Sequence, residues 1–314
     1  MSNKLHVKQG WLRALVFFFV GMVLSGLLAS IIVSVIMSGF FGGALIKTNS
    51  IPNTMILYCL DKIGILFCLW YFRHVIDELT VTSLGFSWKG FGKDALLGSF
   101  VAVLTIAVGT FLLYLGNNLT IRVDNFDLSN TLYAILFFII VAFVEEVIVR
   151  GYILNSLMES MNRWLALFIS AIIFTLWHLA NPGITLMAEL NIFIAGVLLG
   201  VNYIYTKNLW FAIFFHFAWN FFQGTILGYH VSGLPIDTGF LQTITRGPEE
   251  ITGGVFGFEG SVFAAFLQLI AIAALAIYYE KKYGKRLINV DKPIKNVIKV
   301  ETITSDSIES TESL

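Results

Sequence analysis

The chain has few charged residues. Lys, Arg, Asp and Glu make up 13% of its 314 residues, whereas soluble domains contain about 25%. Hydrophobic residues make up 57%, and the mean hydropathy is +0.81. Because so few charges cannot cover the surface of a water-soluble domain, the sequence predicts an integral membrane protein.

The chain also has few cysteines and no net charge. The two cysteines, Cys59 and Cys68, lie in one apolar run, where packing is favoured over a disulfide or redox pair. Twenty basic residues balance 20 acidic residues, so the net charge is zero and no nucleic acid is expected as a partner. Membrane lipid is the expected partner instead. The basic cluster 281–286 is expected to anchor the chain at the lipid head groups.

Long apolar runs recur along the chain. About 20 apolar residues in a helix cross the hydrocarbon core of a bilayer, which is about 30 Å thick. Eight such runs predict an all-α fold, a polytopic membrane bundle of about eight transmembrane helices. The first run exceeds the 7–15 residues of a cleaved signal peptide, so it is expected to be retained. The runs are Ala14–Met37, Thr54–Phe72, Ala95–Leu115, Thr131–Val149, Trp164–Ala180, Leu186–Tyr205, Leu209–Leu227 and Val262–Tyr279.

Basic residues predict which way the bundle faces, because Lys and Arg accumulate in cytoplasmic loops. With eight spans and an inner N-terminus, the outer side holds Lys47, Arg122 and Arg246, and Lys62 lies inside the second span. We therefore expect a multi-pass protein of the cell membrane with both termini in the cytoplasm. The 16 residues on the inner side are Lys4, Lys8, Arg13, Arg73, Lys89, Lys93, Arg150, Arg163, Lys207, Lys281, Lys282, Lys285, Arg286, Lys292, Lys295 and Lys299.

Two regions are expected along the chain. Residues 1–290 would form the transmembrane catalytic domain. Residues 291–314 are polar and rich in Ser, Thr and acidic residues, a composition that cannot bury a core. This tail is predicted to be disordered and cytoplasmic.

Polar residues within the apolar runs indicate function, because an ionised side chain at the bilayer centre costs about 2.5 kcal/mol or more. Glu145, Glu146 and Arg150 continue the fourth run. Glu146 and Arg150 are four apart and share a helix face, which predicts an ion pair, whereas Glu145 points about 100° away and is expected to be unpaired. Alternatively, all three groups reach water at the cytoplasmic end of the span.

Two further runs carry histidine. His178 lies near the end of the fifth run, and His216 lies four residues before Asn220 in the seventh. Each taken alone could serve helix packing. At 1.5 Å per residue, Glu145 and His216 come out at similar depth, but His178 comes out about 10 Å nearer the outer face, which a tilted fifth helix would correct.

These groups are sufficient for hydrolysis if they meet in one polar intramembrane cavity. Glu145 and His178 could activate water, while His216 and Asn220 could stabilise an oxyanion. Glu145, His178 and His216 could instead hold a divalent metal such as zinc together with a water. The residues alone leave both mechanisms open, and no His-Glu-x-x-His zinc helix occurs in the chain.

The three motifs, in this order on separate apolar runs, resemble those of the CPBP family of intramembrane proteases, also called the Abi family. The motifs are Glu145-Glu146-x-x-x-Arg150, Phe174-x-x-x-His178 and His216-x-x-x-Asn220, within a core of about 133–228. The family includes type II CAAX prenyl proteases and bacterial proteins linked to bacteriocin processing and self-immunity.

The resemblance implies an intramembrane endopeptidase that cleaves a membrane-associated or prenylated peptide without a covalent intermediate. It implies that Glu145 activates water, that His178 assists, and that His216 and Asn220 stabilise the oxyanion. Glu146 and Arg150 would be structural. Family naming calls these enzymes metalloproteases, so the resemblance leaves open whether a divalent metal is a cofactor.

Two other functions fit the same residues. A non-catalytic bacteriocin-immunity or peptide-binding membrane protein could use the cavity without cleaving its ligand. A secondary transporter could use Glu145 and His178 as a proton relay, but the chain lacks the inverted repeats typical of such transporters. The substrate, the cleavage site and the oligomeric state do not follow from the sequence.

Overall fold

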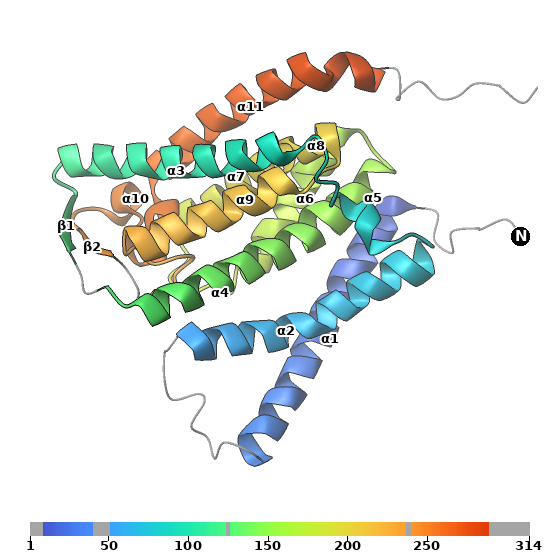
Figure 1. Cartoon of the computed structure of the whole chain (residues 1–314), viewed down its shortest axis with the longest axis horizontal. Helices are drawn as coiled ribbons and strands as arrows, with labels where there is room; N and C mark the ends of the chain where they lie inside the picture. The colour runs from blue at the N-terminus through green and yellow to red at the C-terminus, as the bar shows by residue number, and fades with distance from the viewer. Residues whose placement is uncertain (1–8, 40–50, 124–125, 237–239, 289–314) are drawn as a thin grey trace, which may run out of the picture.

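The chain folds into a helix bundle (Figure 1). The structure is a computed structural model that describes residues 9–39, 51–123, 126–236 and 240–288. The predicted polar tail of residues 291–314 lies outside these ranges. The α-helices are α1 (Gly10–Gly39), α2 (Ile51–Tyr71), α3 (Gly92–Leu115), α4 (Leu128–Glu146), α5 (Asn155–Met158), α6 (Arg163–His178), α7 (Leu186–Val201), α8 (Tyr203–Thr206), α9 (Trp210–Asn220), α10 (Glu249–Thr252) and α11 (Val262–Ile288).

The shorter elements connect or continue these helices. Three π-helices, η2 (Phe72–Ile76), η4 (Val147–Leu154) and η5 (Phe221–Ile226), continue α2, α4 and α9 without a break. The 3-10 helices are η3 (Val81–Leu84), η6 (Gly254–Phe256) and η7 (Phe258–Gly260). Strands β1 (Leu119–Val123) and β2 (Leu241–Thr245) pair antiparallel, with Leu119 opposite Thr245. The sequence predicted neither the π-helices nor this ribbon.

All eight predicted runs coincide with helices, which confirms an all-α polytopic bundle. Among the described residues, six stretches are long and apolar enough to cross a membrane. The other two are shorter: α6 has 16 residues and is about 24 Å long, and η5 completes α9. The six stretches are Gly10–Ile31, Met55–Ile76, Gly92–Leu115, Leu128–Met158, Leu186–Thr206 and Val262–Gly284.

The fourth span is longer than predicted. Its helix does not end at Val149 but continues through η4 and α5 to Met158. Arg150 is 1% exposed within it, so the prediction that Arg150 lies on the inner side is wrong, as is the alternative in which the acidic motif reaches water. The apolar face of η4 packs in the core and carries the helix past the motif.

The longer helix also corrects the predicted mismatch in depth. Glu145 lies about 20 Å from the helix end at Met158, and His178 lies about 22 Å from the start of α6 at Arg163. The turn between Met158 and Arg163 therefore places both side chains at the same level of the bundle. No unusual tilt of α6 is needed.

Helix packing positions the site at the centre. α9 packs against α3 and α4, and α7 packs against α6 and α11, while α1 pairs mainly with α2 (Figure 1). Gly196 and Gly200 allow the close approach of α7 to α6, because a Cβ at Gly200 would lie 2.3 Å from Leu167 Cδ1. This Gly-x-x-x-Gly pair therefore serves helix packing.

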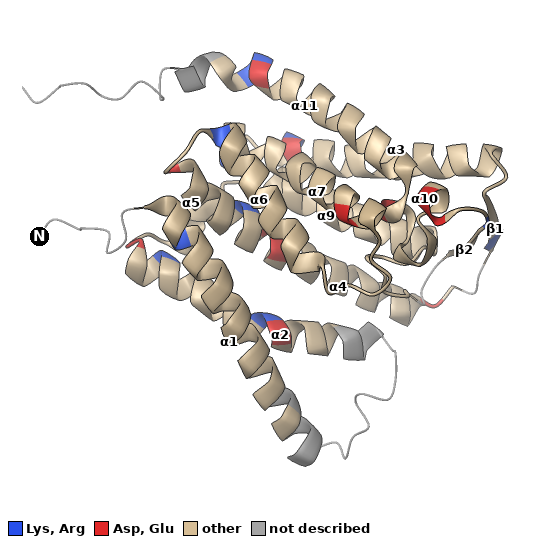
Figure 2. Cartoon of the chain, turned by 180° about the vertical axis from the view of Figure 1, so that it is seen from behind, with Lys and Arg blue, Asp and Glu red and all other residues tan. Residues whose placement is uncertain are grey.

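The two ends of the bundle differ. α1 begins and α11 ends on the same side, whereas the β1–β2 ribbon and α10 lie at the opposite end (Figure 1). Most Lys and Arg residues of the described part lie toward the side where α1 begins, and Arg122 lies on β1 at the other end (Figure 2). An even number of membrane crossings would place the start of α1 and the end of α11 on the same side.

Candidate active site

Glu145 is buried in the middle of the bundle, at the end of α4. Its side chain is not unpaired, as the helix geometry had predicted, because the Tyr58 hydroxyl of α2 donates to Glu145 Oε1 at 3.1 Å. The other oxygen, Oε2, faces His178 Nε2 at 3.6 Å and has no hydrogen-bond partner within the described part of the chain. One oxygen of this carboxylate is therefore held and the other is left for chemistry.

His178 ends α6 with one ring nitrogen already committed. Its Nδ1 lies 2.8 Å from the carbonyl oxygen of Phe174, one helical turn earlier. Since a carbonyl oxygen only accepts, Nδ1 carries the proton, and in the neutral ring Nε2 has a free lone pair. Nε2 and Glu145 Oε2 are thus two acceptors facing the same space.

A second chain of contacts runs through Glu146. This carboxylate is fully buried, and its Oε1 accepts from Arg150 Nη1 at 3.0 Å, as the four-residue spacing predicted. The same oxygen lies 2.9 Å from His216 Nδ1 on α9. Arg150 Nη2 also donates to the Gly196 carbonyl oxygen at 3.0 Å. Glu146 and Arg150 therefore fix His216 in place and neutralise each other, which is necessary at this depth.

Asn220 completes the set of predicted residues. It is 6% exposed on the last turn of α9, and its carboxamide makes no hydrogen bond to another described residue. Glu145, His178, His216 and Asn220 all line one cavity of about 170 Å³. Its remaining walls are mainly apolar side chains of α2, α4 and the segment 231–236. The predicted polar cavity thus exists, and the four residues converge on it.

Two residues near the site, Tyr58 and Glu259, were not predicted from the sequence. Tyr58 is one of 11 tyrosines in the chain, and only the packing of α2 against α4 distinguishes it. Glu259 lies in the Gly-rich segment 253–260, which inserts into the bundle with Phe256 and Phe258 fully buried. Its carboxylate accepts from the backbone N–H of Ser232, and burial raises the pKa of the Glu259 carboxyl.

The described side chains around the cavity are not grouped as metal ligands. No three His, Cys, Asp or Glu side chains of the described residues are arranged to hold a metal ion. Glu146 holds His216 through Nδ1, which leaves Nε2 of His216, Nε2 of His178 and Oε2 of Glu145 as the atoms that would hold a metal. A metal bound by Glu145, His178 and His216 therefore stays an untested prediction, and the mechanism proposed below uses only side chains of the chain itself.

Together, the fold and the site define a multi-pass helical membrane protein with a carboxylate, two imidazoles and a carboxamide around a buried cavity. Residues 127–222 match the family model described as type II CAAX prenyl endopeptidase Rce1-like. This match confirms the resemblance to the CPBP and CAAX protease family, and it includes all three motifs. The family implies an intramembrane CAAX endopeptidase that acts on a membrane-associated peptide. No curated protein matches the chain.

Proposed function

We propose that the protein cleaves a peptide bond of a membrane-associated, prenylated peptide with a water molecule activated by Glu145 and His178. The observation that carries this proposal is the pair of free acceptors, Glu145 Oε2 and His178 Nε2, 3.6 Å apart on the cavity wall. A water that donates one proton to each acceptor is held with a lone pair directed into the cavity.

The reaction needs one proton transfer at Glu145. The water oxygen attacks the carbonyl carbon of the substrate while its proton passes to the Glu145 carboxylate. The tetrahedral intermediate then collapses, the carbon–nitrogen bond breaks, and the leaving amine takes the proton back from Glu145. His178 holds the water in the attacking orientation through Nε2, and Tyr58 holds the carboxylate by its other oxygen.

In this proposal Asn220 and His216 stabilise the oxyanion. The Asn220 carboxamide is a donor without a competing partner in the described structure. His216 can donate from Nε2 only when both ring nitrogens carry protons, because Nδ1 already faces Glu146. Glu146 pairs with that form of His216, so its role in the proposal is to position His216 rather than to contact the substrate.

The walls of the cavity support an apolar substrate that enters from the lipid. Phe137, Phe138 and Val141 of α4 line it, together with Leu234 and Ile236. An extended peptide near a prenylated C-terminus satisfies this requirement. We also propose that the bundle end at which α1 begins faces the cytoplasm, in agreement with the distribution of basic residues (Figure 2).

The test is a comparison of membrane peptides by mass spectrometry, in cells that express the wild-type protein or the Glu145→Gln variant. The variant keeps the shape and the Tyr58 contact but cannot accept a proton. We expect peptide fragments with a new C-terminus only in the wild-type cells. Equal membrane levels of the two proteins are the control for folding and insertion.

The same comparison separates the peptidase from a binding protein. If peptides co-purify with both proteins and no fragment depends on Glu145, the cavity binds without cleaving. That result would support the alternative in which the protein sequesters a peptide, as an immunity protein would. It would remove the catalytic assignment of all four residues.

A further inference from the structure

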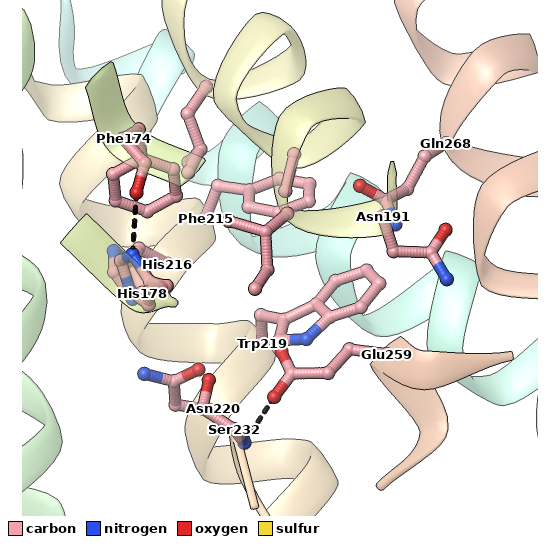
Figure 3. A pocket seen from close by; sticks show the side chains of 13 residues that line it. Phe174, His178, Asn191, Phe215, His216, Trp219, Asn220, Ser232, Glu259 and Gln268 are labelled. Carbon is pink, nitrogen blue, oxygen red and sulfur yellow. Dashed lines mark hydrogen bonds between the residues drawn. The ribbon is translucent and has the colours of Figure 1, made fainter. Parts of the chain in front are cut away.

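A second, smaller pocket lies on the far side of the two histidines. It shares His178, His216, Asn220 and Ser232 with the cavity that contains Glu145, but Glu145 itself does not line it. Its far end is formed by Asn191 of α7 and Gln268 of α11, the histidines lie at the other end, and Glu259 of η7 lies between them beside Ser232 (Figure 3). None of the three motifs includes Asn191, Gln268 or Glu259.

The far end carries buried polar atoms without partners. Gln268 is 1% exposed, and neither its amide nitrogen nor its amide oxygen has a hydrogen-bond partner within the described part of the chain. Asn191 is also 1% exposed; its Nδ2 donates to the Ser261 carbonyl oxygen at 2.9 Å, while Oδ1 has no partner there. Unbonded buried amides are costly, so these atoms require a ligand that both donates and accepts.

The size of the pocket selects the ligand. Its volume is about 50 Å³. One buried water needs about 10–15 Å³ measured in this way and makes two to four hydrogen bonds, so the pocket holds a few water molecules. Glu259 and the free amide atoms of Gln268 and Asn191 supply those bonds on one side, and the rings of Phe174, Phe215 and Trp219 close the others.

We propose that this pocket, formed by Gln268, Asn191 and Glu259, stores water beside the two histidines and delivers it to the hydrolytic site. The inference rests on the proposed function, because each cleaved peptide bond consumes one water and the surrounding lipid contains almost none. Asn220 and Ser232 border both pockets, so a water has a short polar path from one to the other. Gln268 is then a positioning residue for water, not a catalytic residue.

The first test compares kinetics of wild type and Gln268→Leu in proteoliposomes with a prenylated peptide. Leu has a similar size but cannot form a hydrogen bond to water. We expect kcat to fall about tenfold with KM unchanged, because one hydrogen bond to the stored water is lost. The solvent deuterium isotope effect on kcat should shrink, because delivery of water replaces proton transfer as the slow step. Gln268→Asn, which restores the amide, should recover most of the rate.

Thr105→Val is the matched control. Thr105 is 6% exposed on α3, and its hydroxyl donates to Val101 O of the same helix, away from the pocket. This variant should keep the wild-type rate and isotope effect. A loss of kcat in Gln268→Leu that Gln268→Asn does not recover, together with an unchanged isotope effect, would overturn the proposal.

A series of substrates tests whether the pocket binds a side chain of the peptide instead of water. If Gln268→Leu changes KM and reorders a series of peptides that differ beside the cleaved bond, the pocket binds a substrate side chain and the water proposal is wrong. If the wild type cleaves no peptide, the proposed function fails separately. Cryo-electron microscopy of the wild type in lipid nanodiscs then tests the pocket alone: ordered water density within hydrogen-bond distance of Gln268 supports storage, and a dry or lipid-filled pocket contradicts it.

Discussion

Two clusters of buried charge lie at different levels of the bundle and are bonded differently. The anchor cluster, Arg13, Arg73 and Asp77, joins α1 to η2 near the end where α1 begins. Asp77 uses both oxygens: Oδ1 accepts from Arg13 at 2.6 Å and Oδ2 from Arg73 at 3.1 Å. Arg13 also pairs with Glu159 in the turn after α5.

The site cluster, formed by Glu145, Glu146, Arg150, His178 and His216, lies in the middle of the bundle and is as deeply buried. Here one oxygen of each glutamate has no hydrogen-bond partner among the described residues. The carboxylate of the anchor cluster is saturated, whereas those of the site cluster are not. Burial and charge alone therefore do not distinguish structure from chemistry, and the unused acceptor is the more informative feature.

The largest expected effect is on the site cluster. His178→Ala should lower kcat about 10²- to 10⁴-fold, because it removes one of the two groups that hold the attacking water. The double variant with Glu145→Gln should be little worse than Glu145→Gln alone, since the two groups act on the same water. Single-turnover rates of the three variants measure this coupling, and independent, multiplying effects would contradict it.

The anchor cluster should respond in stability instead. Asp77→Ala leaves Arg13 and Arg73 without their shared partner, and breaking a buried pair costs about 3–5 kcal/mol. We expect a lower temperature of thermal unfolding in detergent, with kcat per folded molecule unchanged. A variant of normal stability but lost activity would show that the comparison between the clusters is mistaken.

The smallest effect is expected at Tyr58. Tyr58→Phe removes one hydrogen bond to the Glu145 carboxylate, worth about 1.5 kcal/mol, and should slow cleavage about tenfold with little change in stability. Rates measured with the same prenylated peptide test this value. Tyr71→Phe is a suitable control, because Tyr71 is an exposed tyrosine near the end of the same helix.

Much of the fold follows from hydropathy, because each apolar run must form a helix to satisfy its backbone in lipid. The end of the fourth span could not be predicted from hydropathy. Arg150 interrupts the apolar pattern, but its ion pair with Glu146 allows it to lie inside the helix. The π-helices η4 and η5, directly after Glu146 and Asn220, depend on packing that no local pattern encodes.

The four proposed catalytic residues could be selected from the sequence because polar groups are rare in apolar runs. Gln268 met the same criterion, as the one amide in the run Val262–Tyr279, which has no charged residue, and would have been found by applying it consistently. Glu259 and Tyr58 could not be found in this way. Their proximity to the site arises from contacts between segments far apart in the chain.

The most direct test of the central claim uses purified protein in proteoliposomes and one defined prenylated peptide. The wild type is expected to release the C-terminal fragment with repeated turnover. Glu145→Gln is expected to be at least about 10²-fold slower while unfolding at the same temperature. Cleavage by Glu145→Gln at the wild-type rate would contradict the claim that Glu145 activates the water.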